Sequence, residues 1–315
     1  MKKFFDSFGA TSKGIFVEIK ANKLLFLMIL PAVLYFVVFA YIPMGGLIIA
    51  FKDYNFAKGI FGSEWCGFKN FEFFFKSGQL LRLTLNTLKY NLIFLGIGTF
   101  FNIITGIILS ELSGKIYKKI TQSIILFPYL ISWVVIGIIT YNILNYDTGL
   151  LNSVLKYFGK EPIQVYNMPE AWPFIITFFH IWKNVGYGSI FYLSAITGFD
   201  TECYESAEID GAGLLKRIWY ITLPMLKPTI ITLLLLNLGG VLRGNFDMFY
   251  QLIGNNSILY NATDIIDTFV FRSLAEGSNI GMSSAASLYQ SIVCFIFITI
   301  ANKLVKKYDS NSALY

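Results

Sequence analysis

The sequence is poor in the residues from which soluble enzymes build active sites. Charged residues make up 14% of its 315 positions, and it contains three cysteines and one histidine. A single histidine excludes a histidine-rich metal cluster and gives a Ser-His-Asp triad little support. Cys66, Cys203 and Cys294 lie far apart, so neither a disulfide framework nor a metal site follows. The phosphate-binding motif GxxxxGK[S/T] is also missing. We therefore expect no catalytic residue, no metal and no ATP site of its own.

Apolar residues are what the sequence has in excess. Hydrophobic residues make up 55% of the chain and aromatic residues 17%, which is more than a soluble globule can bury. They form runs close to the roughly 20 residues that a helix needs to cross a bilayer. This pattern predicts an all-α polytopic membrane protein with six transmembrane helices, covered by lipid. The six runs are Leu24 to Phe51, Leu85 to Leu109, Ser123 to Ile143, Trp172 to Ile196, Thr229 to Leu242 and Gly281 to Ala301.

The basic residues indicate the orientation of these helices. Fourteen Lys and Arg lie before the first run and after the second, fourth and sixth, whereas eight lie in the other connections. Cytoplasmic loops are enriched in Lys and Arg, so we expect a bacterial inner-membrane protein with both termini in the cytoplasm. The net charge of +6 then reflects topology, and we expect no nucleic-acid partner.

This scheme divides the chain into segments. The first run is too long for a signal peptide and has no small-residue cleavage site, so we expect a retained span. The outer connections 52–84, 144–171 and 246–280 are expected to be loops. The segments are a cytoplasmic start at 1–23, a first helix at 24–51, a core of five helices at 85–303 that includes a cytoplasmic loop at 198–228, and a cytoplasmic tail at 304–315.

The connection 198–228 has the pattern of a folded segment. Asp200 is suited to cap a short helix that runs to about Asp210. Gly211 can then adopt the left-handed conformation that ends a helix. A second short amphipathic helix, with apolar residues between positions 214 and 219, would lead to the fifth span. The pattern predicts a helix-turn-helix at the membrane surface.

The same connection contains a spaced set of residues, namely Glu205, Ala207, Asp210, Gly211, Ala212, Ile221, Leu223 and Pro224. With this spacing it resembles the EAA signature of binding-protein-dependent ABC importer permeases. Ser206 in place of a second alanine, and Ile218 in place of a common phenylalanine, depart from the family pattern. In that family the signature forms a coupling helix that fits a cleft in the ATPase subunit. The alternative is an amphipathic helix that rests on lipid headgroups. The coupling candidates are Glu205, Ser206, Ala207, Asp210, Gly211, Ala212, Leu223 and Pro224, and Ile221 belongs to the same match.

Two further segments, 264–272 (DIIDTFVFR) and 287–291, resemble the carbohydrate branch of this family, particularly permeases for oligosaccharides derived from complex polysaccharides. The resemblance implies a type I importer permease fold (MetI-like) with a coupling helix-turn-helix. It also implies four kinds of contact: a second homologous permease, two copies of a cytoplasmic ABC ATPase that hold ATP and Mg, an extracytoplasmic solute-binding protein, and a transported sugar. This chain itself would bind no cofactor.

Polar residues inside the apolar runs are the candidates for the sugar path, because a charge or amide in a span usually faces the protein interior or water. Lys183 either lines the path or bonds another helix, and the sequence favours neither. Arg243 and Asp247 are four residues apart, which favours pairing on one helical face over contact with solute. For any single amide, bonding between helices is the default. The candidates are Lys183, Asn184, Tyr187, Asn237, Arg243, Asp247 and Gln290, with Asn91, Asn102 and Asn142 as further amides.

Two functions of other classes stay open at this point. A secondary carrier or channel would move sugar without an ATPase, although the apolar runs contain no acidic relay of the kind that proton-driven carriers use. A scaffold or sensor subunit would bind the ATPase without forming a path, and it would tolerate substitution of Lys183 and Asn184.

Overall fold

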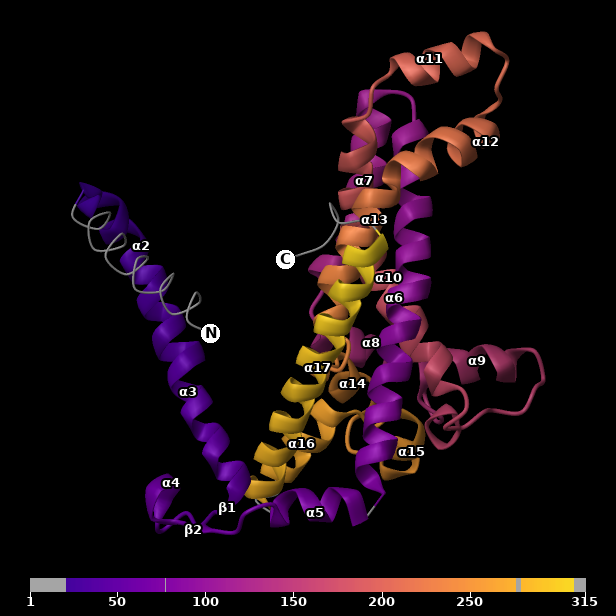
Figure 1. Cartoon of the computed structure of the whole chain (residues 1–315). Coiled ribbons are helices and arrows are strands. Elements are labelled where there is room, and N and C mark those ends of the chain that lie inside the picture. The colour runs from indigo at the N-terminus through magenta and orange to yellow at the C-terminus, as the bar shows by residue number, and fades with distance from the viewer. Residues whose placement is uncertain (1–20, 77, 276–278, 309–315) are drawn as a thin grey trace.

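The computed structural model describes residues 21–76, 78–275 and 279–308, and it is helical almost throughout (Figure 1). Among these residues, four helices are long and apolar enough to cross a membrane, or five if one bent pair counts as a single span. The prediction of a helical membrane protein is therefore confirmed, with a smaller number of clear spans than the expected six. The four are Lys23–Phe51, Gln79–Glu111, Leu214–Leu238 and Ile280–Lys303.

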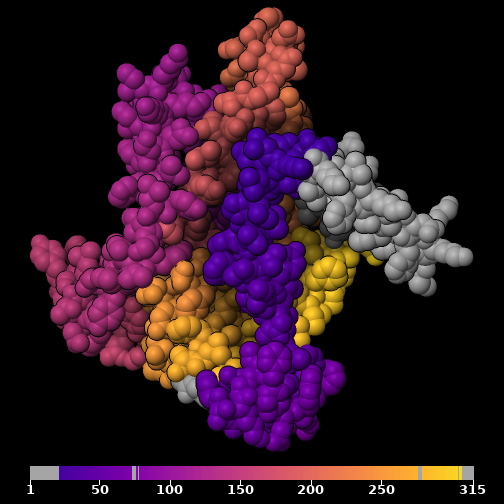
Figure 2. Space-filling view, turned by 90° about the vertical axis from the view of Figure 1, so that its left-hand side faces the viewer, coloured from indigo at the N-terminus to yellow at the C-terminus, as the bar shows by residue number. Residues whose placement is uncertain are grey.

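The first span is an arm that stands away from the bundle in Figure 1 and crosses in front of it in Figure 2. Residues 21–45 are all exposed, and only the end of the arm packs, where Ala50 is fully buried beside α17. Of the expected cytoplasmic start, residues 1–20 lie outside the described residues. The arm consists of α2 (Lys23–Phe36), the π-helical η1 (Val37–Tyr41), α3 (Ile42–Met44) and the 3-10 helix η2 (Gly45–Phe51).

A short surface layer joins the arm to the bundle at the end that carries α5. A two-stranded antiparallel sheet pairs Lys52 with Trp65. The elements of this layer are β1 (Lys52–Asp53), α4 (Gly59–Gly62), β2 (Glu64–Trp65) and α5 (Lys69–Lys76).

The centre of the bundle contains α6 (Gln79–Glu111), α10 (Trp172–Thr197) and α13 (Leu223–Leu238) side by side, with α17 (Ile280–Tyr308) next to α13 (Figure 1). A glycine permits the close contact of α6 with α10, because a Cβ on Gly106 would lie 3.1 Å from the Ser189 carbonyl oxygen. Because α17 runs to Tyr308, the expected tail at 304–315 begins as helix, and residues 309–315 lie outside the described part.

The third predicted span, Ser123 to Ile143, is broken into two helices, which corrects the expectation of one. Helices α7 (Lys115–Leu130) and α8 (Trp133–Leu144) meet at 89°. Ile131 and Ser132 between them have extended backbone angles. The Ser132 hydroxyl accepts a hydrogen bond from the Val135 N–H (3.4 Å), so it caps a new helix instead of continuing the old one.

The expected outer loop at 246–280 is mostly helical and forms part of the core, which is a second correction. Met248, Phe249, Leu252 and Ile253 are buried on one face of α14, against α6, α8 and α10. Helix α13 ends at Leu238, so the fifth span stops before the predicted Leu242, at a turn that contains two glycines. The elements of this region are α14 (Phe246–Ile253), η5 (Ser257–Leu259), α15 (Tyr260–Thr263) and α16 (Ile266–Ala275), and α9 (Leu150–Tyr157) and η3 (Val165–Asn167) lie beside them.

Helix α11 (Glu202–Ile209) projects from the end of the bundle opposite α5 (Figure 1). The second short helix that we predicted does not stand alone. Helix α12 (Leu214–Arg217) and the π-helical η4 (Ile218–Thr222) continue into α13 as one 25-residue helix. Pro224 falls in the first turn of α13, where a missing N–H is tolerated after the π-helical turn, and the helix does not break there.

Candidate functional site

The turn after α11 has the geometry that the sequence predicts. At the other end of α11, before its first residue, the Asp200 carboxylate accepts a hydrogen bond from the Glu202 N–H (3.0 Å). The turn itself is formed by the residues that follow Ile209. Gly211 has a φ of +74°. The Gly211 N–H donates to the Glu208 carbonyl (3.0 Å) and the Ala212 N–H donates to the Ala207 carbonyl (2.8 Å). These two bonds form a Schellman motif, which requires a left-handed residue at the position of Gly211.

Two side-chain contacts, which sequence reasoning missed, brace α11 against the span that follows it. The Tyr204 hydroxyl lies 3.1 Å from the Thr222 hydroxyl. Arg217 forms an ion pair with Glu208 across the turn (3.4 Å). The two residues of each pair are 18 and 9 positions apart in the sequence and lie on different helices, so no local pattern predicts these contacts. They fix the angle between α11 and the α12–α13 helix.

The braced segment presents acidic and apolar side chains together on its outer surface. Glu205, Ser206 and Asp210 are exposed, whereas Ala207 and Ala212 are half-buried. Large apolar residues are exposed beside them, namely Ile209, Leu215, Trp219 and Tyr220. The other two coupling candidates, Leu223 and Pro224, lie in the first turn of α13 and not on the projecting helix. A surface with this mixture has the character of a protein-docking surface.

A groove of about 710 Å³ lies between α6, α10 and α13, and its lining contains both apolar and polar side chains. Four of the path candidates, Asn184, Tyr187, Asn237 and Arg243, line this groove. The other polar residues in the lining are Asn91, Thr99, Asn102, His180 and Tyr192. Glycines bring the helices close enough to form its walls, because a Cβ on Gly188 would lie 2.3 Å from the Asn102 side chain.

Within the described ranges of the chain, three amides in this groove are each anchored through one N–H. The Nδ2 atom of Asn184 donates to the His180 carbonyl (2.8 Å), that of Asn237 to the Leu233 carbonyl (2.9 Å), and that of Asn91 to the Arg243 carbonyl (3.2 Å). An amide has a second N–H and a carbonyl oxygen. Each anchored amide therefore keeps a donor and an acceptor for hydroxyl groups in the groove.

Lys183 lies outside the groove and bonds another helix. It is 7% exposed, and its ammonium donates to the carbonyl oxygens of Tyr129 (2.8 Å), Pro128 (3.4 Å) and Ile131 at the end of α7. The rings of Tyr129 and Trp133 lie within 5.5 Å of it. Of the two interpretations of Lys183, the structure therefore supports a hydrogen bond between helices and not a place in the groove lining. The lysine pairs carbonyl groups at the 89° break in the third span, of which that of Pro128 also accepts a hydrogen bond from the Ile131 N–H (3.2 Å).

Two other candidates, Asp247 and Gln290, also lie away from the groove. Arg243 belongs to the turn before α14 and Asp247 to the first turn of that helix, and among the described residues no ion pair joins them. The predicted pairing on one helical face is therefore wrong, since α13 ends before Arg243. Gln290 is buried and donates to the Leu242 carbonyl (2.5 Å) and to Asp267 (3.0 Å), so it ties α17 to the turn.

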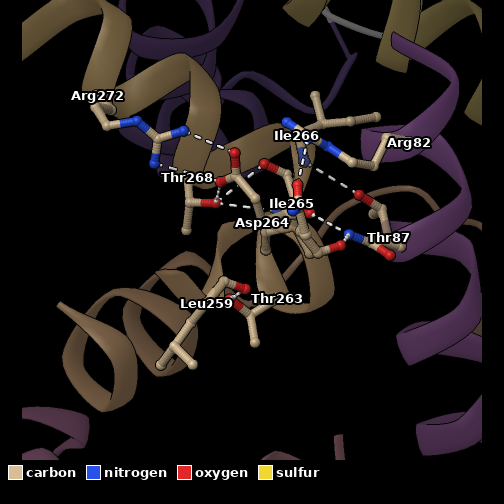
Figure 3. Close-up of polar contacts among 11 residues, drawn as sticks. Arg82, Thr87, Leu259, Thr263, Asp264, Ile265, Ile266, Thr268 and Arg272 are labelled. Carbon is tan, nitrogen blue, oxygen red and sulfur yellow. Dashed lines mark hydrogen bonds and ion pairs between the residues drawn. The ribbon is translucent and has the colours of Figure 1, made fainter. Parts of the chain in front are cut away.

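Two acidic residues of the segment 264–272 hold the region after α13 in place. Asp264 accepts hydrogen bonds from Thr268 (2.7 Å) and Arg272 (2.7 Å), and Thr87 on α6 accepts one from the Ile266 N–H (3.1 Å) (Figure 3). Asp267 accepts one from the Gly244 N–H (2.7 Å). Burial raises the pKa of Asp267, and this hydrogen bond opposes the shift.

Comparison with known proteins identifies the family. The model of the family described as "binding-protein-dependent transport system inner membrane component" matches residues 102–310. The chain is 36% identical to the polygalacturonan/rhamnogalacturonan transport system permease protein YteP of Bacillus subtilis (strain 168), over 94% of this chain and 92% of that protein. It is 36% identical to the protein LplB of the same strain, over 94% and 93%.

Two solved structures are also similar. One is a bacterial ABC transporter involved in the import of the acidic polysaccharide alginate, with a TM-score of 0.84 and 32% identity over 94% of this chain and 99% of the matched chain. The other is a bacterial alginate ABC transporter in complex with an alginate pentasaccharide-bound periplasmic protein, with a TM-score of 0.82 and 32% identity over 92% and 96%. The chain belongs to the binding-protein-dependent transport system inner membrane components: it is a permease subunit of an ABC importer of the carbohydrate branch, and not itself the ATPase.

Proposed function

We propose that this permease translocates an oligosaccharide released from a complex, acidic polysaccharide. The observation that carries the proposal is the groove between α6, α10 and α13, whose lining contains anchored amides and aromatic rings. Sugar hydroxyls need donors and acceptors in this form, and aromatic rings suit the apolar faces of sugar rings. The relatives named for polygalacturonan, rhamnogalacturonan and alginate support the same class of substrate.

The chain is proposed to cross the membrane six times with both termini in the cytoplasm. Helix α10 has 26 residues, about 39 Å at 1.5 Å per residue, which is enough to cross a bilayer. It falls outside the clearly apolar helices because His180, Lys183 and Asn184 lower its mean hydropathy. Those residues face the groove and the end of α7 and not lipid. The bent α7–α8 pair supplies the remaining span, and the positive-inside rule places α11 in the cytoplasm.

The proposed assembly contains a second homologous permease, two copies of a cytoplasmic ATPase and an extracytoplasmic solute-binding protein. ATP and Mg belong to the ATPase, and this chain supplies its docking surface at α11. Because α12, η4 and α13 form one helix, a movement of α11 is transmitted to Asn237 in the groove wall. Coupling requires the ATPase to bind this surface differently in the inward-facing and outward-facing states.

Affinity purification from the native cell tests the assembly. The chain is tagged and extracted gently, and the co-purifying proteins are identified by mass spectrometry. A second permease and an ATPase are expected with the wild type, and the ATPase is expected to be lost from Glu205→Lys. Glu161→Lys, an exposed acidic position outside the helix-turn-helix, is the matched control and should retain it. Recovery of the chain alone in several detergents would favour a carrier that needs no ATPase.

Gly211→Pro tests the lever. Proline fixes φ near −65°, whereas Gly211 has +74°, so the substitution breaks the Schellman turn. In the reconstituted complex, uptake is expected to be largely abolished while ATP hydrolysis continues. Gly213 already has a φ of −65°, so Gly213→Pro is the matched control. Uptake that is unchanged in Gly211→Pro would rule out the lever.

A further inference from the structure

We propose that Arg243 selects a carboxylate-bearing sugar, such as a uronate, within the groove. This inference rests on the proposed function and names the residue that reads the charge of the substrate. Among the described residues that line the groove, Arg243 is the one with a permanent charge, and the lining contains no Asp or Glu. The groove therefore has a single fixed charge, and it is positive.

The guanidinium of Arg243 is available to a ligand. The side chain is exposed, and within the described part of the chain no hydrogen bond or ion pair engages it. The nearby carboxylate of Asp267 bonds the Gly244 N–H and the Gln290 amide instead (2.7 and 3.0 Å). Arg243 acts on Asp267 through space, where its charge lowers the pKa of the Asp267 carboxyl against the effect of burial. All the N–H groups of the guanidinium thus stay free to donate.

The backbone on both sides of Arg243 is fixed. Gln290 bonds the Leu242 carbonyl, Asn91 bonds the Arg243 carbonyl, and Asp267 holds the Gly244 N–H. Gly244 is required at this point, because a Cβ there would lie 2.2 Å from Ile265 Cδ1 and 2.9 Å from Asp267 Oδ2. The turn is therefore pressed against α16, and the Arg243 side chain reaches the groove from a rigid base. Asp267 and Gln290 act as positioning residues.

The place of Arg243 suits the recognition of one end of the sugar. Its carbonyl bonds Asn91, which is the lining residue of α6 nearest the start of that helix, next to α5. This is the outer end of the groove in the proposed orientation. A guanidinium donates two parallel hydrogen bonds to a carboxylate, a geometry that a neutral sugar does not offer. A charge-assisted bond of this kind corresponds to roughly a tenfold to hundredfold preference.

The test compares an acidic and a neutral sugar of the same size. The complete transporter is reconstituted in liposomes with its binding protein, and uptake of an oligogalacturonide is measured against the same oligosaccharide with its carboxylates methyl-esterified. The same binding protein serves every variant, so its own selectivity cancels when the acid-to-ester uptake ratios are compared. The variants are Arg243→Gln, Arg243→Met, Arg243→Lys as the conservative replacement, and Lys227→Gln as an exposed cation on α13 outside the groove.

The expected result is a roughly tenfold to hundredfold fall in the acid-to-ester uptake ratio for Arg243→Gln and Arg243→Met. Arg243→Lys should recover part of the ratio, and Lys227→Gln should match the wild type. Ester uptake serves as the internal measure of an assembled transporter. A ratio unchanged in both neutral variants, with ester uptake intact, would overturn the role of Arg243 alone. A wild-type complex that hydrolyses ATP and transports neither sugar would overturn the proposed function and this inference with it.

Discussion

The bundle contains two clusters of polar groups within apolar helices. They differ in how many of their hydrogen-bond donors and acceptors are bonded within the protein. In the groove, Asn184 and Asn237 each donate one N–H to a carbonyl of their own helix, which leaves the second N–H and the amide oxygen available. At the break between α7 and α8, Lys183 donates through its ammonium to the carbonyl oxygens of Pro128, Tyr129 and Ile131. We propose that the amides of the groove belong to the sugar path and that Lys183 belongs to the scaffold.

Lys183→Met is the substitution with the largest expected effect on stability. It keeps most of the length of the side chain but removes the ammonium donor from the carbonyls of Tyr129 and Ile131, at a cost of about 3 kcal/mol. The melting temperature of the purified chain in detergent should fall clearly. Arg is expected to restore part of the loss, and Lys227→Met, an exposed lysine on α13, should change nothing. If Lys183→Met melts like the wild type, the break does not depend on this cap.

The double substitution Asn184→Ala and Asn237→Ala should affect transport instead of stability. Both amides bond only their own helices, so their loss leaves the packing intact. Loss of two sugar contacts is expected to raise the sugar concentration for half-maximal uptake roughly tenfold. Asn142→Ala is the matched control, because Asn142 makes the same kind of bond to the Ile138 carbonyl (3.0 Å) on α8 outside the groove. An equal effect of Asn142→Ala would remove the distinction between the two clusters.

Ser132→Ala should have the smallest effect. The Ser132 hydroxyl caps the start of α8, and loss of such a cap costs about 1 kcal/mol. The expected outcome is a small fall in melting temperature with unchanged sugar affinity. Ser123→Ala serves as the control, since that hydroxyl bonds the Lys119 carbonyl within the same helix. An altered sugar affinity in Ser132→Ala would mean that the break itself contributes to the groove.

Local patterns in the sequence predicted the features that depend on few neighbouring residues. The left-handed Gly211 follows from the residue type and its position, and the structure confirms it. Asp200 bonds the Glu202 N–H as a capping residue would, but the N-cap itself is Thr201, one residue later than predicted. The Tyr204–Thr222 and Glu208–Arg217 contacts depend on how two helices fold back on each other. Such contacts have no signature in either helix alone.

The sequence named the polar residues of the spans as one set and did not separate them. Lys183 and Asn184 are neighbours in the chain, but successive residues of an α-helix point about 100° apart, so they serve different surfaces. Which surface carries the groove depends on where α13 packs, and the amide of Gln290 was indistinguishable from that of Asn237. The helix α14 was missed for a different reason. Its buried face extends over only two helical turns and follows a polar loop segment, so the sequence pattern of this region is typical of a loop.

Cysteine accessibility tests the division between path and scaffold most directly. In a background without Cys66, Cys203 and Cys294, the variants Asn184→Cys, Asn237→Cys and Ser189→Cys are assembled into the full transporter and treated with a hydrophilic thiol reagent. Ser189 lies on the same helix as Asn184 and is completely buried. The account predicts rapid modification at positions 184 and 237 that bound oligosaccharide slows, and none at 189. Modification at 189 as fast as at the other two, or no protection by the sugar at 184 and 237, would contradict it.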